Sequence, residues 1–535
     1  MLFNSYGFIF GFLPLSLVGF YSLGRLGRKP AASWLVFSSF VFYGLWNPRY
    51  TFLLALSIGF NYLISLMIHA NRQHHFLQRT YLTLGIFVDI GVLIYYKYLV
   101  DIIGFTYGLS VYDSPTPSIT IPLGISFFTF TQIGYLVDVQ QGVVADKSPL
   151  NYVLFVTFFP HLIAGPILHN REIMPQFSEK RTYRFSIENL TVGSVIFIIG
   201  LAKKCLLADP LSAQVSTGFA PSASLTLSAA WLLMFTYAIQ IYFDFSGYTD
   251  MAIGIARMFN VRFPMNFNSP YKATSIIDFW QRWHMTLTRL LTLYLFNPLA
   301  ISIARSHAAR KLPISRSAQT STNAFFMMTA FPLLITMSVA GIWHGAGIKF
   351  LIFGLLHGFY LTVNHGWRIF RSPRASKLGP LHRLSNWLLT ISSILVALVF
   401  FRAPTMNSAL ATVSAMAGVH GLGNVVFRNL LLHGVSSIQL IFTQHGPAAA
   451  TSGLKAIENA MQYFLTAFLW FIVLIMPNTQ QIMHKYEPAL GRINPCALQR
   501  MTWKPTIASA AALGAISAFA IMAVAGTTPF VYFQF

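Results

Sequence analysis

Residues 224–246 read SLTLSAAWLLMFTYAIQIYFDFS, an apolar run in which Asp244 is the one charged side chain. A helix that crosses a bilayer needs about 20 mostly apolar residues, and comparable runs recur along nearly the whole chain. The candidate spans are 2–23, 33–49, 50–70, 80–104, 118–138, 150–168, 190–208, 224–246, 276–300, 323–345, 349–370, 384–403, 459–480 and 505–529. We therefore expect an all-α polytopic membrane protein with about eleven true crossings, the other runs being re-entrant or interfacial.

Composition extends this prediction to all 535 residues. Hydrophobic residues make up 55% of the chain and charged residues 9%, with a mean hydropathy of +0.59. Soluble domains are about one quarter charged, and a soluble chain of this length would need polar surface for several domains. The composition excludes that class, and we expect one integral membrane domain over residues 1–535.

The net charge of +22 follows from basic residues that cluster between the apolar runs. This pattern is typical of cytoplasmic loops facing anionic lipid, and it argues against nucleic-acid binding. The most basic stretches of the C-terminal half are 305–316, 368–383 and 485–504. Placing them in the cytoplasm puts 404–458 and the tail Thr527–Phe535 outside. The first run, Leu2–Leu23, precedes its basic residues and is predicted to be a retained span, so both termini are expected outside.

Two of the runs, 118–138 and 150–168, contain residues that break helices. These are Pro122, Gly124, Pro160, Gly165 and Pro166. A lipid-facing helix would not tolerate such breaks, because its freed backbone groups would have no partners. We expect re-entrant helices packed inside the protein.

Polar side chains within the apolar runs are the candidate functional residues. Asp244 lies near the end of the 224–246 run and Asp250 stands just beyond it, and each carboxylate costs roughly 2.5–3.5 kcal/mol on insertion scales. Arg257 stands two helical turns after Asp250, so the spacing predicts a local ion pair on one helix face. Contact with a substrate or donor is the alternative for this block, which begins at Tyr242.

Two histidines stand beside tryptophans. Trp280, Trp283 and His284 would share one face of a helix, where paired tryptophans commonly anchor an interface. His344 ends an apolar run within AGIWHGAG, and an imidazole there suits general acid–base work. The flanking glycines are predicted to leave room for a ligand near the backbone. His357, on the next run, is a weaker candidate.

Other chemistries find little support. Cys205 and Cys496 are far apart and lack metal-ligand spacing, so we expect neither a disulfide nor a metal site. No Ser-His-Asp triad is discernible; Ser246 lies beside Asp244 without an assigned base, which leaves an acyl-serine unsupported.

The chain resembles the membrane-bound O-acyltransferase family, and most closely its bacterial branch of alginate O-acetylation proteins. The resemblance is carried, in order, by Ile121–Phe130, Tyr135–Val139, Phe158–Ile167, Gly200–Lys204 with Ala208–Asp209, Tyr242–Thr286, Trp343–Gly345 and Pro529–Phe535. Single blocks would be weak evidence, whereas the ordered set is specific. The most family-like part spans about 118–365.

The resemblance implies a ring of transmembrane and re-entrant helices around a central funnel in the bacterial inner membrane. It implies transfer of an acetyl group, with acetyl-CoA as the expected donor and no bound cofactor, to a secreted or cell-surface polysaccharide. A periplasmic O-acetyltransferase or glycan-export protein would be the partner, near an exposed aromatic tail. His344 is the expected catalytic residue and His284 the second one. Residues expected to contact substrate or donor are Trp343, Trp280, Trp283, Asp244, Tyr242, Lys203, Lys204 and His161.

One departure from the family pattern bears on the acceptor. Thr292-Leu293 and Pro298-Leu299-Ala300 stand where alginate acetylation proteins usually carry Arg-Asp and a Pro-Leu-Gly-Gly run. The departure suggests a different glycan. The alternatives are D-alanyl transfer to a cell-envelope polymer from an acyl carrier protein, acylation of lipid or protein, and a non-enzymatic transporter or flippase, for which no inverted repeat is visible.

Overall fold

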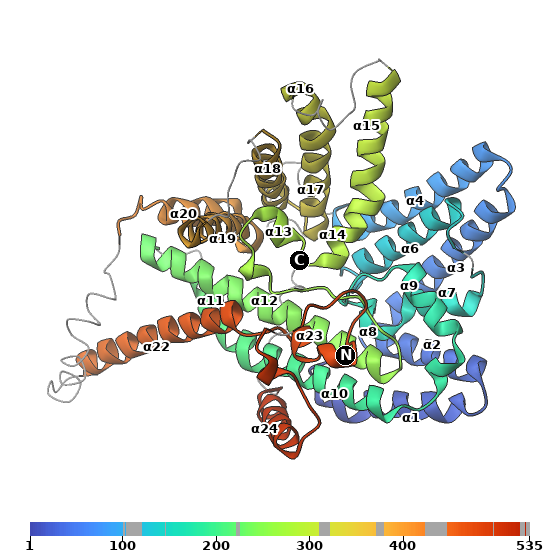
Figure 1. Cartoon of the computed structure of the whole chain (residues 1–535), viewed down its shortest axis with the longest axis horizontal. Coiled ribbons are helices and arrows are strands. Elements are labelled where there is room, and N and C mark those ends of the chain that lie inside the picture. Colours follow the sequence, from blue (N-terminus) through green and yellow to red (C-terminus); the bar gives the residue numbers. More distant parts are fainter. Residues whose placement is uncertain are drawn as a thin grey trace.

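The computed structural model describes residues 1–99, 102, 120–144, 146–220, 225–309, 321–370, 379–422, 447–495, 497–524 and 530. Within these ranges the chain forms helices, and its β-structure is an isolated bridge between Pro264 and Leu490. Figure 1 shows the helices fanning outward around a centre occupied by α12, α13 and α14. The predicted all-α polytopic fold is confirmed.

The α-helices are α1 (Leu13–Gly24), α2 (Arg28–Gly44), α3 (Pro48–Ala70), α4 (His75–Lys97), α6 (Ile125–Gln140), α7 (Pro149–Thr157), α8 (Phe159–Leu162), α9 (Asn170–Ser178), α10 (Ile187–Ala202), α11 (Ser212–Gly218), α12 (Leu227–Met258), α13 (Ile276–Trp280), α14 (Met285–Leu291), α15 (Asn297–Ala309), α16 (Thr322–Phe325), α17 (Phe331–His344), α18 (Ile348–Phe370), α19 (Pro380–Arg402), α20 (Met406–Met416), α22 (Pro447–Ile475), α23 (Thr479–Ile482) and α24 (Ile507–Ala523). Short π-helical segments extend several of them. These are η1 (Gly7–Phe12), η3 (Lys203–Ala208), η6 (Thr292–Phe296) and η8 (Phe326–Ala330).

Seven helices in the described part of the chain are long and apolar enough to cross a membrane. They are Gly7–Gly24, Pro48–Ala70, His75–Lys97, Ile187–Gly218, Met285–Ala309, Thr322–His344 and Pro380–Arg402. Helices α12 and α18 were also expected as spans and are 32 and 23 residues long, but they are not among the seven. The chain is a multi-pass membrane protein, and the figure of about eleven crossings stays a prediction.

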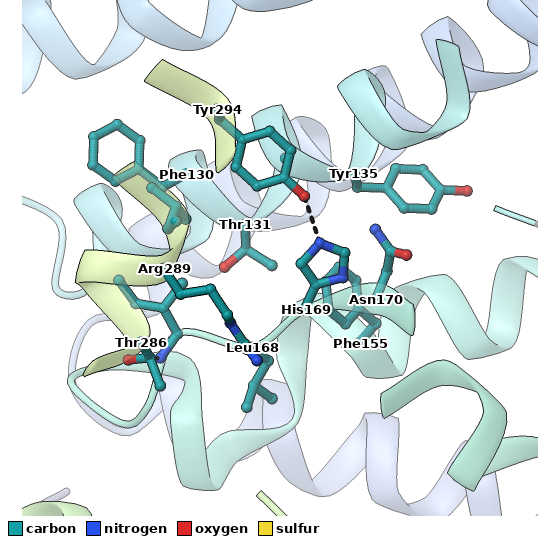
Figure 2. A pocket seen from close by; sticks show the side chains of 13 residues that line it. Phe130, Thr131, Tyr135, Phe155, Leu168, His169, Asn170, Thr286, Arg289 and Tyr294 are labelled. Carbon is teal, nitrogen blue, oxygen red and sulfur yellow. Dashed lines mark hydrogen bonds between the residues drawn. The ribbon is translucent and has the colours of Figure 1, made fainter. Parts of the chain in front are cut away.

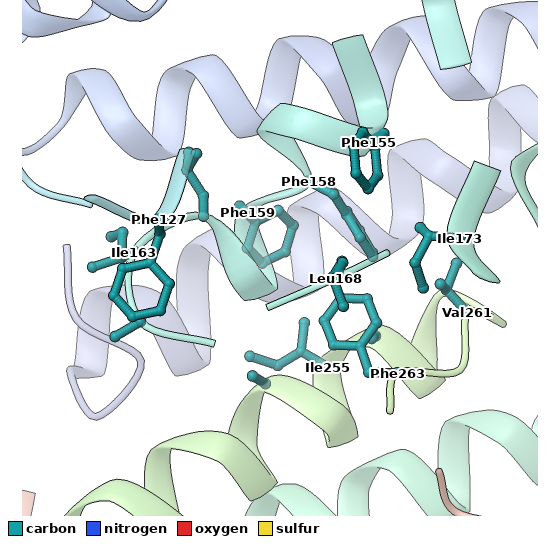
Figure 3. Packing of buried hydrophobic residues seen from close by; sticks show 14 of the residues in the cluster. Phe127, Phe155, Phe158, Phe159, Ile163, Leu168, Ile173, Ile255, Val261 and Phe263 are labelled. Atoms are coloured by element: carbon teal, nitrogen blue, oxygen red, sulfur yellow. The ribbon is translucent and has the colours of Figure 1, made fainter. Parts of the chain in front are cut away.

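The predicted breaks in 118–138 and 150–168 are confirmed. Helix α6 begins only after Gly124, whose left-handed backbone (φ 73°) favours glycine. The second run ends α7 at Thr157 and continues as the single turn α8. Aromatic side chains fill this break: Figure 3 shows Phe158 close to Phe263, with their rings 5.7 Å apart, and the Phe159 ring lies 5.9 Å from that of Phe158. The break therefore lies in the protein interior.

The expectation of one continuous span over 276–300 is wrong. Helix α13 ends at Trp280, and α14 begins at Met285 after a turn. His284 adopts a left-handed backbone (φ 44°, ψ 51°) at this turn. Trp280, Trp283 and His284 consequently do not share one helix face, because the helix that would align them is interrupted.

Helices α10 and α12 pack with their backbones almost touching. A Cβ atom on Gly193 would lie 2.5 Å from the carbonyl oxygen of Gly254, and one on Gly200 would lie 2.6 Å from that of Gly247. Small residues permit such approach, which drives helix association where lipid supplies no hydrophobic force. This contact holds α12, the central helix in Figure 1, in place.

Replacing Gly247 with leucine is expected to lower the free energy of unfolding by about 2 kcal/mol or more, because overpacking typically costs 1–3 kcal/mol and here the obstacle is rigid backbone. The measurement is the apparent melting temperature of the detergent-purified protein. Gly59→Leu is the matched control, since a Cβ on the exposed Gly59 of α3 meets no atom within 4 Å. Equal melting temperatures for both variants would contradict the packing argument.

The predicted exposed C-terminal tail is wrong for Phe530, the tail residue that the structure describes. Phe530 is buried, its ring centroid lies 4.3 Å from that of Tyr248, and the Lys204 ammonium sits 4.8 Å above its ring. The other residues of the tail lie outside the described residues.

Candidate active site

His344 is the last residue of α17, and its side chain is buried. The predicted position at a helix end is confirmed, but the predicted room for a ligand is wrong at Gly341 and Gly345, whereas a Cβ atom on Gly347 would meet no atom within 4 Å. A Cβ atom on Gly341 would lie 2.2 Å from the Phe350 carbonyl oxygen, and one on Gly345 would lie 2.2 Å from the Phe350 ring. These glycines allow α18 to pack against α17, so they leave no room for a ligand at these two positions.

Helix α4 holds the end of α17 from the other side. The Lys97 ammonium donates hydrogen bonds to the carbonyl oxygens of Trp343 (2.5 Å) and His344 (3.1 Å), and the Tyr98 hydroxyl donates to that of Ile342 (2.8 Å). The last carbonyls of a helix lack intrahelical partners and carry partial negative charge, so a cation stabilises them. The sequence interpretation missed Lys97. Lys97 could have been found as the lone lysine within an apolar run, because ionisable residues inside such runs usually have a function.

His284 is completely enclosed and is held by Asn266. The His284 Nδ1 atom lies 3.0 Å from the Asn266 Oδ1 atom. The same oxygen accepts from the backbone N–H of Thr286 (3.2 Å) and from its hydroxyl (2.9 Å). The Met285 N–H donates to the Asn266 carbonyl oxygen (2.9 Å). Asn266 thus fixes the turn in which His284 lies; the sequence interpretation missed it, because these bonds join segments that no local pattern connects.

Aromatic rings connect the two predicted catalytic histidines. The Trp343 ring lies 4.7 Å from the His344 ring and 6.4 Å from the His284 ring, measured between centroids. On the far side of His344, the Phe353 ring is 6.1 Å from His344 and 4.8 Å from His357. The structure therefore brings His284, Trp343 and His344, from two separate predicted segments, into one buried site.

The remaining predicted tryptophans and Tyr242 border this site. The Trp280 indole N–H donates to His357 Nδ1 (3.3 Å). The Trp283 ring stacks on Phe279 (5.7 Å) and lies 6.5 Å from the Tyr242 ring. Trp283 and Tyr242 both pack edge-on against Phe267, whose ring lies 6.5 Å from that of His284. Contact of Trp280, Trp283 and Tyr242 with substrate or donor stays a prediction.

His161 lies in the α7–α8 break. Its Nε2–H donates to the Phe155 carbonyl oxygen (2.9 Å), and its ring packs edge-on against Phe263. The side chain is buried. This is the geometry of a satisfied core histidine, and its predicted substrate contact is untested.

The carboxylates of α12 pair with lysines of η3, not with Arg257. The Lys203 ammonium lies 2.6 Å from Asp250 Oδ2, which also accepts from the Thr479 hydroxyl (2.6 Å). Arg257 donates instead to the Tyr486 carbonyl oxygen (3.2 Å). The predicted Asp250–Arg257 pair is therefore wrong, because helical spacing identifies only local partners and the true partner comes from another helix.

Lys204 forms the second pair. Its ammonium lies 2.6 Å from Asp244 Oδ1 and 2.7 Å from Asp209 Oδ1, and its side chain is 0% exposed. Three charges are thus enclosed between α12 and η3. The predicted roles of Lys203, Lys204 and Asp244 in donor or substrate binding stay predictions.

A cavity of about 420 Å³ lies beside the His284 turn. Trp280, Met285 and Thr286 line it close to His284, and Arg289 and Arg492 line it as well. Two parallel hydrogen bonds (2.7 and 2.9 Å) join Arg289 to Glu172, another lining residue. A cavity this size can admit an extended small-molecule chain.

A smaller interior pocket adjoins this cavity through Thr286 and Arg289 (Figure 2). Figure 2 shows the Tyr294 hydroxyl directed at His169, 2.8 Å from its Nε2 atom. The same hydroxyl donates to Asp138 Oδ2 (3.0 Å). Tyr294, His169 and Asp138 therefore satisfy one another's hydrogen-bonding groups in a polar cluster next to the pocket. Among the residues that the structure describes, no three His, Cys, Asp or Glu side chains are grouped to hold a metal ion.

Similarity to known proteins identifies the family of this chain. Residues 140–312 match the membrane-bound O-acyltransferase family. The chain is 38% identical over 452 residues to a peptidoglycan O-acetyltransferase of Helicobacter pylori, covering 79% of this chain and 81% of the relative. It is 36% identical over 424 residues to a probable alginate O-acetylase of Pseudomonas aeruginosa, covering 78% and 75%.

A more distant likeness is to a teichoic acid D-alanyltransferase of Bacillus subtilis, 27% identical over 241 residues, which cover 45% of this chain and 58% of the relative. The similarities to the two O-acetylating proteins extend over most of both chains. They include the segments that supply His284, Trp343 and the α10–α12 contact. The chain therefore belongs to the membrane-bound O-acyltransferase family and is an acyltransferase.

Proposed function

We propose that this protein transfers acetyl groups from acetyl-CoA, across the bacterial inner membrane, to hydroxyl groups of a cell-envelope glycan, with His344 as the general base. The observation that supports this most directly is the buried site in which the Trp343 ring lies 6.4 Å from the His284 ring and 4.7 Å from the His344 ring. An imidazole can take a proton near neutral pH and return it in the next step. The relatives named for O-acetylation support the acetyl group as the one transferred.

The chemical step balances without a cofactor. The acceptor O–H gives its proton to the imidazole of His344 while its oxygen forms a bond to the carbonyl carbon of the thioester. The C–S bond then breaks, the sulfur leaves with its electron pair, and the imidazolium returns the proton to it. The products are an O-acetyl ester and free CoA thiol. Hydrogen bonds in a buried site are stronger than in water, which stabilises the charge that develops.

The cavity beside His284 is the proposed route for the donor. Its lining residue Arg492 belongs to the basic stretch 485–504, which the positive-inside rule assigns to the cytoplasm. Guanidinium groups bind phosphates well, and Arg289 and Arg492 both line the cavity. The thioester would extend from there toward His284 and His344.

The acceptor is proposed to be a glycan hydroxyl on the outer side. The relatives are named for peptidoglycan and for alginate, which are both glycans. The departure at Thr292-Leu293 favours a glycan other than alginate. Delivery through a periplasmic O-acetyltransferase or a glycan-export partner is part of the proposal, as are termini that face the periplasm.

The test is a donor comparison with purified protein in lipid nanodiscs. We expect acetyl-CoA labelled in the acetyl group, with the proposed periplasmic partner also supplied, to yield base-labile label on soluble peptidoglycan or polysaccharide fragments, together with an equal amount of free thiol. A D-alanyl-loaded acyl carrier protein, supplied as the other donor, should give no transfer. Transfer from the carrier protein but not from acetyl-CoA would overturn the proposal in favour of D-alanylation.

A further inference from the structure

The side-chain amide of Asn266 has only one orientation that suits its neighbours. The backbone N–H of Thr286 lies 3.2 Å from Oδ1 and can only donate, so the atom it faces must be the amide oxygen. On the other side, the amide Nδ2 donates to the Thr249 hydroxyl (3.4 Å). Asn266 is itself 0% exposed, so no solvent competes for these bonds.

This orientation determines which nitrogen of His284 carries the proton. The Nδ1 atom lies 3.0 Å from Asn266 Oδ1 and must donate to it, because an oxygen lone pair cannot pair with a nitrogen lone pair. In a neutral imidazole only one nitrogen is protonated. The Nε2 atom then presents its lone pair, so it accepts hydrogen bonds and does not donate them.

We propose that Asn266 is a positioning residue that holds His284 with its proton on Nδ1, so that Nε2 accepts a hydrogen bond from the acceptor hydroxyl. This inference rests on the proposed acyl transfer and decides between two roles for His284. Polarising the thioester carbonyl requires a donor aimed at the developing oxyanion. Orienting an alcohol requires an acceptor, which is what the Nε2 atom supplies.

The surroundings of His284 preserve this tautomer. Its turn is fixed by the bond from Met285 N–H to the Asn266 carbonyl (2.9 Å), and the Thr286 hydroxyl accepts from Ile167 N–H (3.0 Å). The Phe245 ring packs edge-on against the imidazole at 4.8 Å. Rotation of the ring would therefore break the bond between Nδ1 and Asn266.

Other titratable and charged groups border the turn from each neighbouring element. His344 on α17 acts electrostatically on His284, and His357 on α18 accepts from Trp280; Lys203 on η3 and Asp250 on α12 line a pocket together with Asn266, and Asp278, Arg282 and Arg289 lie on α13, the turn after it and α14. Arg282 pairs with Asp278 and Lys203 with Asp250, which leaves these charges balanced.

The direct test is solid-state NMR of protein with nitrogen-15 histidines in lipid bilayers. The His284 signals are identified as those lost in His284→Ala. We expect Nδ1 protonated and Nε2 unprotonated in the wild type, and a mixture of tautomers in Asn266→Leu. The matched control is Asn268→Leu, on the same loop, which removes a bond from Asn478 (3.2 Å) and should leave the His284 signals unchanged. Protonated Nε2 in the wild type would overturn the inference.

A second variant keeps the test valid if Asn266→Leu fails to fold. Asn266→Asp retains an oxygen acceptor for Nδ1–H, so the tautomer should persist, whereas its charge favours protonated imidazole. We expect the acidic limb of the acetyl-transfer pH profile to move up by about one pH unit. An unmoved limb together with a changed tautomer would contradict the positioning role. The NMR readout needs no activity, so it remains decisive even if acetyl-CoA proves not to be the donor.

Discussion

Replacing His344 with glutamine is expected to reduce acetyl transfer by about 10²–10⁴-fold, the range that a positioned general base contributes. Glutamine fills much of the space between the Trp343 and Phe401 rings, which lie 4.7 and 5.1 Å from the imidazole. It can form hydrogen bonds but cannot take a proton at neutral pH. The loss should therefore appear in kcat, with the KM for acetyl-CoA nearly unchanged. The measurement is thiol release and labelled ester formation with the purified protein.

The control for this variant is His420→Gln. His420 is exposed on the loop after α20, 3.1 Å from the Ser414 hydroxyl, and its replacement should leave the rate within about twofold of wild type. Melting temperatures of both variants show whether folding is intact. A folded His344→Gln protein that retains most of its transfer rate would remove His344 from the chemistry and make His284 or His357 the base to examine next.

The sequence predicted the fold class and the position of His344 because both depend on local patterns. Apolar runs predict helices in lipid from composition alone. Pro160 and Gly124 mark breaks that the structure confirms, because each residue acts on its own backbone. His344 ends α17 as expected, since the glycines after it do not continue a helix.

What the sequence could not predict depends on contacts between distant segments. Asp250 pairs with Lys203, which lies 47 positions earlier, whereas helical periodicity could only suggest Arg257. The turn at His284 contains no glycine or proline that would predict it from the sequence. It forms because Asn266 binds both the imidazole and the backbone that follows. The space beside Gly345 is taken by Phe350, a contact between two helices that no single segment reveals.

Replacing Lys204 with methionine is expected to destabilise the protein by about 3–5 kcal/mol, the usual effect of removing one partner from a buried ion pair. The Lys204 side chain is 0% exposed and neutralises Asp244 and Asp209, at 2.6 and 2.7 Å. Without it, two carboxylates would remain enclosed at the α12–η3 contact with less charge compensation. The measurement is the apparent melting temperature and the yield of folded protein in detergent. Arg181→Met, which removes a pair whose arginine is 84% exposed, should cost less than about 1 kcal/mol.

The double variant Lys204→Met/Asp244→Leu separates architecture from donor binding. Replacing both partners by apolar side chains of similar volume is often neutral, so the double variant should regain much of the stability that Lys204→Met loses. If Lys204 serves only to hold α12 against η3, the folded double variant should keep its KM for acetyl-CoA. If the ammonium binds the donor, KM should rise at least about tenfold, equivalent to the loss of about 1.4 kcal/mol of binding. The enclosed pair favours the structural role, because the Lys204 ammonium is already neutralised by Asp244 at 2.6 Å and would bind a phosphate of the donor only weakly.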